Sequence, residues 1–155
     1  AIKKYCIGIV NGGSTGQADN WAMMDNVTYI MRYAELLLIH AEATLAGAGS
    51  TSDAGALASI NAVRNRAGLT SLTSITFDDI FKERRLELAM EGNRFFDLVR
   101  WGIADTYMNA YFASEKSKIA YLKNGLFTKN RDEYCPIPDN QMRFSKGVYI
   151  QNAGY

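Results

Sequence analysis

The chain has 155 residues, which is enough for one domain with its own core, and its 48% hydrophobic and 21% charged residues are typical of a globular protein. The formal net charge is +1, so there is no electrostatic reason to expect binding to nucleic acid or to an anionic membrane surface. No apolar run is long enough to span a bilayer, and the most apolar one, residues 36–46, is interrupted by His40 and Glu42.

Residues 1–27 are polar and rich in glycine, and they carry no helical pattern. Residues 11–17, NGGSTGQ, have the composition of a loop. The short apolar run at residues 5–10 predicts an edge strand or an extended arm. The basic residues at the start are not followed by an apolar core, as they would be in a signal peptide. We therefore expect an arm that comes from the preceding part of a larger protein.

Two amphipathic helices are predicted at residues 28–46 and 53–68. Apolar residues recur at helical spacing in both, and Gly47 ends the first pattern. Asp53 is a suitable N-cap for the second helix. The short connection, rich in glycine and serine, predicts an antiparallel hairpin about as long as a tetratricopeptide unit.

A third helix is predicted to begin near Thr76 and to continue through Glu91. Asp78 and Asp79 suit the positive end of its dipole. A Gly-Asn pair then weakens or bends the helix, and helical spacing resumes over residues 94–101.

Residues 103–122 predict one or two lesser helices whose aromatic residues, like Trp101, are expected in the core. These aromatic residues are Tyr107, Tyr111, Phe112 and Tyr121. Residues 124–155 are expected to be mostly irregular, with Asp139 or Asn140 capping a short helical turn. The predicted fold class is therefore all-α, with a tetratricopeptide-like helical hairpin, further helices and an irregular C-terminal tail.

Three sequence blocks together resemble the C-terminal part of the SusD/RagB family. The first block joins RYAELLLIHAEA at residues 32–43 to INAVRNRAGL at residues 60–69. The second block, ERRLELAMEGNRFFDLVRWG at residues 83–102, is the most specific. The third is YCPIP at residues 134–138, followed by QNAGY at residues 151–155.

The resemblance divides the chain into an arm, residues 1–27, and a SusD-like C-terminal helical region, residues 28–155. It implies an α-helical, non-enzymatic protein built on tetratricopeptide-type hairpins and several times longer than this chain. SusD-like proteins hold a nutrient, usually a glycan, against a SusC-like TonB-dependent transporter of the outer membrane. The implied partners are thus an oligosaccharide or other nutrient, this transporter, and the N-terminal part of the same protein. The implied place is the cell surface, with a lipid anchor on a cysteine of that N-terminal part.

Glu83, Glu87 and Glu91 are spaced by four residues, so they share one face of the predicted third helix. Like charges at this spacing repel one another unless cations lie between them, and Arg84 and Arg94 are placed to do so. We interpret these five residues as a structural ion-pair network that locks the helix to the hairpin. The alternative is a glycosidase acid/base pair, but carboxylates on one helix face do not flank a bond from two sides.

Trp21 and Asn20 are the candidate ligand-binding residues. Sugar rings stack on exposed aromatic faces, and amide side chains bind their hydroxyl groups. The alternative for Trp21 is a packing role that ties the arm to the hairpin.

His40 is the one histidine of the chain, so we expect a packed or hydrogen-bonded role rather than a metal or catalytic one. Cys6 and Cys135 form no metal-binding pattern, and a disulfide between them stays open. SusD-like proteins usually have an apolar residue at the position of Cys135, which implies a buried packing role for this thiol.

No residue set predicts catalysis, a metal site or a cofactor, and the scattered basic residues do not predict nucleic-acid binding. The predicted function is non-catalytic binding of a nutrient, with a glycan as the expected class, for delivery to a TonB-dependent transporter. One alternative is a tetratricopeptide-type protein-interaction module, which would show a concave helical surface with peptide-sized grooves. The other is an α-helical glycoside hydrolase, which requires two opposed carboxylates across a pocket.

Overall fold

The computed structural model of the chain describes residues 9–10, 13–14 and 29–155. Over this part it contains six α-helices, a 3-10 turn and a two-stranded antiparallel ladder of β1 (Ile9–Val10) with β2 (Gly13–Ser14). The all-α prediction is confirmed, and the apolar run at residues 5–10 ends in one of the two short strands. None of the described helices is long and apolar enough to cross a membrane. The chain divides into two compact units, unit 1 (Ala1–Arg94) and unit 2 (Phe95–Tyr155).

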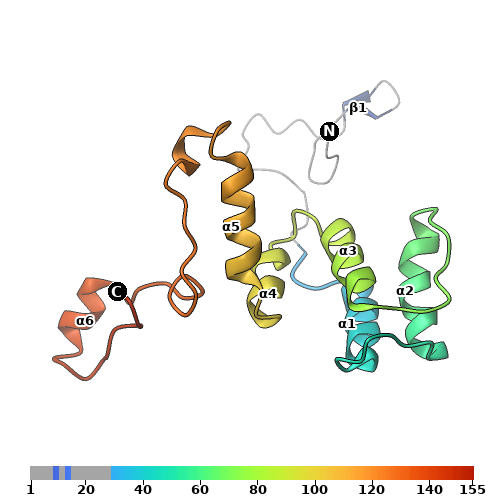
Figure 1. Cartoon of the computed structure of the whole chain (residues 1–155), viewed down its shortest axis with the longest axis horizontal. Helices are drawn as coiled ribbons and strands as arrows, with labels where there is room; N and C mark the ends of the chain where they lie inside the picture. Colours follow the sequence, from blue (N-terminus) through green and yellow to red (C-terminus); the bar gives the residue numbers. More distant parts are fainter. Residues whose placement is uncertain (1–8, 11–12, 15–28) are drawn as a thin grey trace. The chain divides into compact units, whose positions relative to one another are not determined.

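The predicted hairpin is present as α1 (Tyr33–Leu45) and α2 (Ala54–Arg66), which lie side by side (Figure 1). α2 begins where predicted, because the Asp53 side chain accepts a hydrogen bond of 2.9 Å from the backbone N–H of Ala56. α1 begins later than residue 28, because the residue before it, Arg32, has an extended backbone and no side chain caps the helix.

α3 (Phe77–Glu87) begins at the predicted place through a capping box. The backbone N–H of Asp79 donates to Oγ1 of Thr76 at 3.3 Å, and the backbone N–H of Thr76 donates to the Asp79 carboxylate at 2.9 Å. Each side chain thereby satisfies a donor that the first helical turn leaves without a carbonyl partner.

The predicted end of this helix at Glu91 is wrong, because α3 stops at Glu87. The chain then turns through two residues of positive φ, Met90 at 67° and Gly92 at 81°. Glycine adopts this conformation without steric cost, which favours a reversal over a bend in a continuing helix. Glu91 therefore lies in a turn and not on the helix face that it was expected to share.

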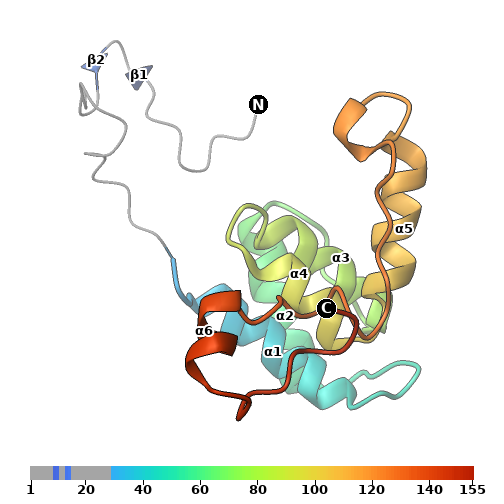
Figure 2. The same cartoon turned by 90° about the vertical axis from the view of Figure 1, so that its left-hand side faces the viewer.

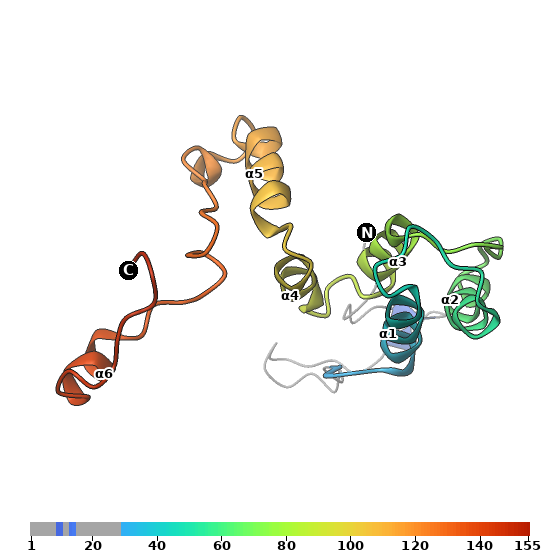
Figure 3. The same cartoon turned by 60° about the horizontal axis from the view of Figure 1, so that its bottom comes forward.

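α1, α2 and α3 enclose one hydrophobic core (Figure 3). Its buried members are Leu38, Ala41, Leu45, Ala56, Ile60, Val63, Ile75 and Ile80. The loops at the two ends of α2 are also joined, since Thr51 and Ile75 exchange backbone hydrogen bonds of 2.9 and 2.8 Å. Each fully buried aliphatic side chain contributes about 1.5–3 kcal/mol, so this core holds the three helices together.

The predicted helices after the turn are also present. α4 (Asn93–Arg100) follows the turn, and α5 (Ala104–Glu115) precedes a 3-10 turn (Ala120–Leu122). The tail is irregular except for α6 (Asp139–Phe144), which is joined to α5 by a long, mostly non-helical connection (Figure 2). Its N-cap is Pro138, so the expectation that Asp139 or Asn140 would cap this turn is wrong.

The expected burial of aromatic and sulfur side chains is wrong for much of unit 2. Trp101 is half-buried, with its ring centroid 4.6 Å from the guanidinium carbon of Arg100. Three of the four aromatic residues in 103–122 are exposed, namely Tyr107, Tyr111 and Tyr121. Cys135 is exposed as well. The described part of unit 2 has too few helices to cover α5 on every side, so helical spacing of aromatics does not lead to burial there.

Candidate functional site

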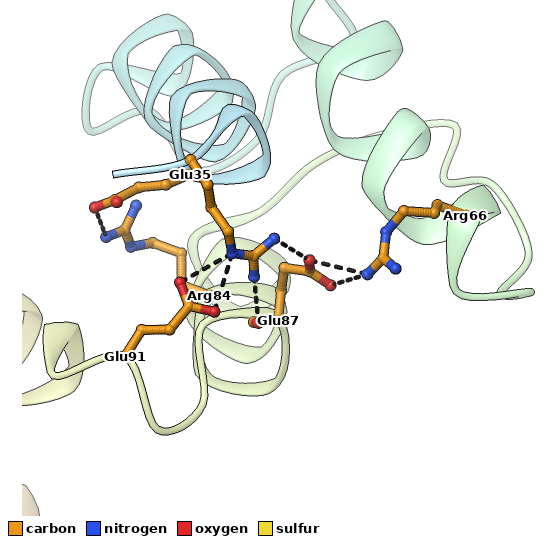
Figure 4. A network of polar contacts seen from close by, with 6 residues as sticks. Glu35, Arg66, Arg84, Glu87 and Glu91 are labelled. Atoms are coloured by element: carbon orange, nitrogen blue, oxygen red, sulfur yellow. Dashed lines mark hydrogen bonds and ion pairs between the residues drawn. The ribbon is translucent and has the colours of Figure 1, made fainter. Parts of the chain in front are cut away.

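The acidic residues of the second sequence block meet arginines of the hairpin, and Arg32 lies at the centre of this network. Its Nε lies 2.9 Å from each carboxylate oxygen of Glu91. Its Nη1 donates to the Glu87 carboxylate at 2.6 Å, and its Nη2 donates to the Glu87 backbone carbonyl at 2.6 Å. Figure 4 shows Glu87 and Glu91 converging on this one guanidinium. Arg32 thus also satisfies a carbonyl in the last turn of α3, where no helical donor remains.

Two further arginines, both near the end of α2, bind the glutamates of α3. Nη2 of Arg66 lies 2.7 Å from the Glu87 carboxylate, so Glu87 is shared between arginines of α1's N-terminus and α2. Nη1 of Arg64 lies 2.8 Å from the Glu83 carboxylate. Both arginines stand in the last turn of their helix, where the dipole favours positive charge.

The two arginines that the sequence assigned to the network have other prominent contacts. Nη2 of Arg84 lies 3.5 Å from the carboxylate of Glu35 on α1, and both side chains are buried. The guanidinium carbon of Arg94 lies 3.9 Å from the ring centroid of Phe81, and its Nη1 is 3.5 Å from the Phe81 carbonyl. Arg84 therefore joins α3 to α1, and Arg94 stacks on α3.

The electrostatic environment of Arg32 favours its charged form. The hydrogen bond to Glu91 raises the pKa of Arg32, burial acts in the opposite direction, and Glu87 raises the pKa further. The net direction is upward from a value that is already high, so the guanidinium is charged at neutral pH and well above it. Because the pKa is raised, the stabilisation is complete below the ordinary arginine pKa and is lost only at extreme alkaline pH.

This arrangement leaves the glutamates little freedom to do chemistry. The side chains of Glu83, Glu87 and Glu91 are only 5%, 8% and 2% exposed, and each is held by at least one arginine. Charge-assisted hydrogen bonds of this length are strong, and removing one partner leaves a buried charge uncompensated. Among the described residues, no three His, Cys, Asp or Glu side chains gather as metal ligands would.

The remaining candidates have separate outcomes. Trp21, Asn20 and Cys6 lie outside the described residues, so their roles stay predictions. His40 is hydrogen-bonded as expected, with Nδ1 2.8 Å from Oγ of Ser59 on α2, although its ring is exposed rather than packed.

Arg32, Arg64 and Arg66 are the residues that reasoning from the sequence missed. The positions of Arg64 and Arg66 at a helix C-terminus were a usable signal of an electrostatic role. The sequence could not show which arginine would meet which glutamate, because that depends on how α3 packs against the hairpin, and these segments are distant in the sequence.

Comparison with known proteins explains why the three sequence blocks occur together. The model of the SusD family matches residues 3–155. The chain belongs to the SusD family. The family match includes most of the segment before residue 28, which the sequence blocks had left out.

Relatives within the SusD family are much longer than this chain. SusD-like protein P2 of Formosa agariphila is 30% identical over 158 residues, an alignment that covers 90% of this chain and 28% of that protein. Surface glycan-binding protein A from Bacteroides thetaiotaomicron is a solved structure with 35% identity and a TM-score of 0.66, covering 83% of this chain and 25% of that one. A laminarin-binding SusD-like protein has 38% identity and a TM-score of 0.63, covering 83% of this chain and 23% of that one.

Proposed function

We propose that this chain is the helical support of a glycan-binding protein that does not cleave its ligand. The observation that carries the proposal is the SusD-family match over residues 3–155, together with solved relatives named for binding surface glycans and laminarin. A glycan site is usually assembled from loops carried on a rigid scaffold, and α1 to α3 have the properties of such a scaffold.

The geometry of the glutamates supports the non-catalytic part of the proposal. A retaining glycosidase needs two carboxyl groups about 5–5.5 Å apart on opposite sides of the scissile bond. Glu83 and Glu87 project from one side of α3 toward the hairpin, and with Glu91 they are bound by arginines and almost fully buried. A sugar would have to displace Arg32 to reach Glu87 or Glu91, which would leave a buried charge unpaired.

The finer part of the proposal concerns partners and place. We infer that the intact protein stands on the cell surface, anchored through a lipid on a cysteine outside residues 1–155. There it delivers a nutrient to a SusC-like TonB-dependent transporter. Family membership supports both statements. Trp21 and Asn20 remain our candidates for one wall of the ligand site.

Isothermal titration calorimetry of the intact protein tests the proposal. The titrants are laminarin and a panel of other oligosaccharides, and a reducing-sugar assay runs on the same mixtures. We expect saturable binding of at least one glycan, with no increase in reducing ends. Heat-unfolded protein is the control for nonspecific heat. Absence of binding to any member of a broad panel, or reducing ends that increase with protein concentration, would contradict the proposal.

A further inference from the structure

The near-neutral charge of the whole chain conceals a local excess of positive charge in unit 2. Residues 116–131, which we name the basic segment, contain no acidic residue and five basic ones, namely Lys116, Lys118, Lys123, Lys129 and Arg131. The other 139 residues hold 12 basic and 16 acidic residues, which is a net charge of −4. A surface that concentrates one sign of charge attracts partners of the opposite sign.

The basic segment follows α5 and then runs back along it. The chain leaves the C-terminus of α5, passes through the 3-10 turn and returns beside the helix (Figures 1 and 2). Gly125 lies against Phe112 of α5, because a Cβ built on Gly125 would be 3.0 Å from Cγ of that ring. The Asn109 side chain accepts from the Phe127 N–H at 2.8 Å and donates to the Phe127 carbonyl at 2.9 Å. Asn109 precedes Lys116 by seven residues, so the basic segment extends along about 10 Å of α5.

Most of the positive charge of the basic segment is not compensated. All five basic residues are exposed. Lys118 and Arg131 each lie near one carboxylate, at N···O distances of 3.0 and 3.6 Å. Lys116, Lys123 and Lys129 form no ion pair with any residue that the structure describes. These three lysines are therefore available to bind the negative groups of a partner.

An exposed aromatic ring lies within the basic segment. Tyr121 belongs to the 3-10 turn, between Lys118 and Lys123 in the sequence, and it is 85% exposed. No other aromatic residue in the described part of the chain is as exposed. An aromatic face of this kind can stack on the apolar face of a sugar ring. A sugar that carries an acid group would meet both the ring and the neighbouring lysines.

We propose that the basic segment binds an acidic polysaccharide, one whose sugars carry uronate or sulfate groups. Lys116, Lys123 and Lys129 bind the acid groups, and Tyr121 stacks on a sugar ring. The length of the segment along α5 suits a polymer better than a single small anion. The inference rests on the proposed glycan-binding function and goes beyond it, because it gives this chain a contact surface of its own and names the class of glycan.

Isothermal titration calorimetry of the intact protein tests the proposal, with heparin and polygalacturonate as acidic polymers and laminarin as a neutral one. We expect binding of at least one acidic polymer, weakened by added salt. The triple variant Lys116→Gln, Lys123→Gln, Lys129→Gln should weaken this binding by about tenfold or more, because it removes the three uncompensated charges. Its affinity for any neutral glycan that the wild type binds should not change.

The matched control removes the same number of exposed charges elsewhere, through Lys82→Gln, Arg85→Gln and Lys146→Gln. We expect this control to weaken binding of the acidic polymer by less than about threefold. Equal losses in the two triple variants would overturn the proposal, because overall charge would then explain the binding. Binding of neutral glycans alone would overturn it while leaving the proposed function intact, and binding of no glycan at all would contradict both.

A second pair of variants tests the stacking and the class of partner. Tyr121→Ala should weaken binding of the acidic polymer by about fivefold, whereas Tyr121→Phe keeps the aromatic face and should change it little. Duplex DNA and vesicles of phosphatidylglycerol are titrated in the same way. If either binds as tightly as the acidic polymer and loses as much affinity in the triple variant of the basic segment, the assignment to a polysaccharide is wrong.

Discussion

Arg32 joins three parts of unit 1 through one side chain. It precedes α1, it binds the carboxylate and carbonyl of the last residue of α3, and it holds Glu91 in the turn that follows. Its charge strengthens each of these contacts, and its three nitrogens in one plane let it bind Glu91, the Glu87 carboxylate and the Glu87 carbonyl at the same time. A lysine would supply the positive charge but not the several N–H donors in one plane.

We predict that Arg32→Met lowers the free energy of unfolding of the intact protein by about 2–4 kcal/mol, because Glu91 is left buried without this partner. Urea denaturation followed by circular dichroism measures the change. The control is Lys118→Met, which removes an exposed pair with Glu115 and should change stability by less than about 0.5 kcal/mol. Equal effects of the two substitutions would mean that Arg32 is an ordinary surface charge.

The sequence pointed to the three glutamates and to Arg84, but not to the arginines that bind these glutamates. The spacing of Glu83, Glu87 and Glu91 is a local property, and like charges on one face demand cations somewhere nearby. Which arginines reach the glutamates depends on how α3 packs against the hairpin, and Arg32, Arg64 and Arg66 were not predicted.

At the scale of the elements, the starts of α2 and α3 were predictable, whereas the start of α1 and the end of α3 were not. Asp53 and Thr76 cap α2 and α3 through bonds that span three residues, so the sequence contains all the information. The end of α3 depends on Met90, whose positive φ is uncommon for its residue type and is not suggested by local propensity.

We predict that Thr76→Ala lowers the free energy of unfolding by about 1 kcal/mol, because it removes the hydroxyl that accepts from Asp79. Thr73→Ala, an exposed threonine of the same loop, is the matched control and should be nearly neutral. Thermal unfolding of both variants measures the difference. A Thr76→Ala protein as stable as the Thr73→Ala protein would show that the capping box contributes nothing.

The C-terminal tail is ordered by side-chain amides rather than by regular secondary structure. Gln151 accepts from the Ile137 N–H at 2.8 Å and donates to the Ile137 carbonyl at 2.9 Å, so it satisfies both backbone polar groups of the residue between two prolines. Asn152 donates to the Cys135 carbonyl at 2.6 Å. The expectation of an irregular tail was sound, but residue patterns do not predict such long-range amide pairs.

We predict that Gln151→Leu increases the hydrogen-exchange rate of the Ile137 amide by about tenfold, because the amide loses its acceptor. Gln141→Leu, on the exposed surface of α6, is the matched control and should leave that rate unchanged. Exchange followed by mass spectrometry of the peptide that contains Ile137 distinguishes the two. Unchanged exchange in Gln151→Leu would contradict the amide pairing.

At the scale of the whole molecule, family membership followed from sequence blocks, whereas burial did not. Trp101, Tyr107 and Tyr111 have helical spacing, yet they are half-buried or exposed. Spacing determines which side chains share a face, but another element must be present to cover that face. The same reasoning applies to α1, where Tyr33 and Leu36 are exposed within the described residues.

We propose that the buried glutamates support the fold of a binding protein and perform no chemistry on a glycan. Glu87→Ala tests it most directly when unfolding, glycan affinity and reducing-end release are all measured on the intact protein. We predict a loss of about 1–2 kcal/mol in stability, smaller than for Arg32→Met because the two arginines left behind are more exposed than the glutamates. Affinity for the bound glycan should change by no more than about threefold. Unchanged stability with a large loss of affinity, or reducing-end release by the wild type that Glu87→Ala abolishes, would contradict the claim.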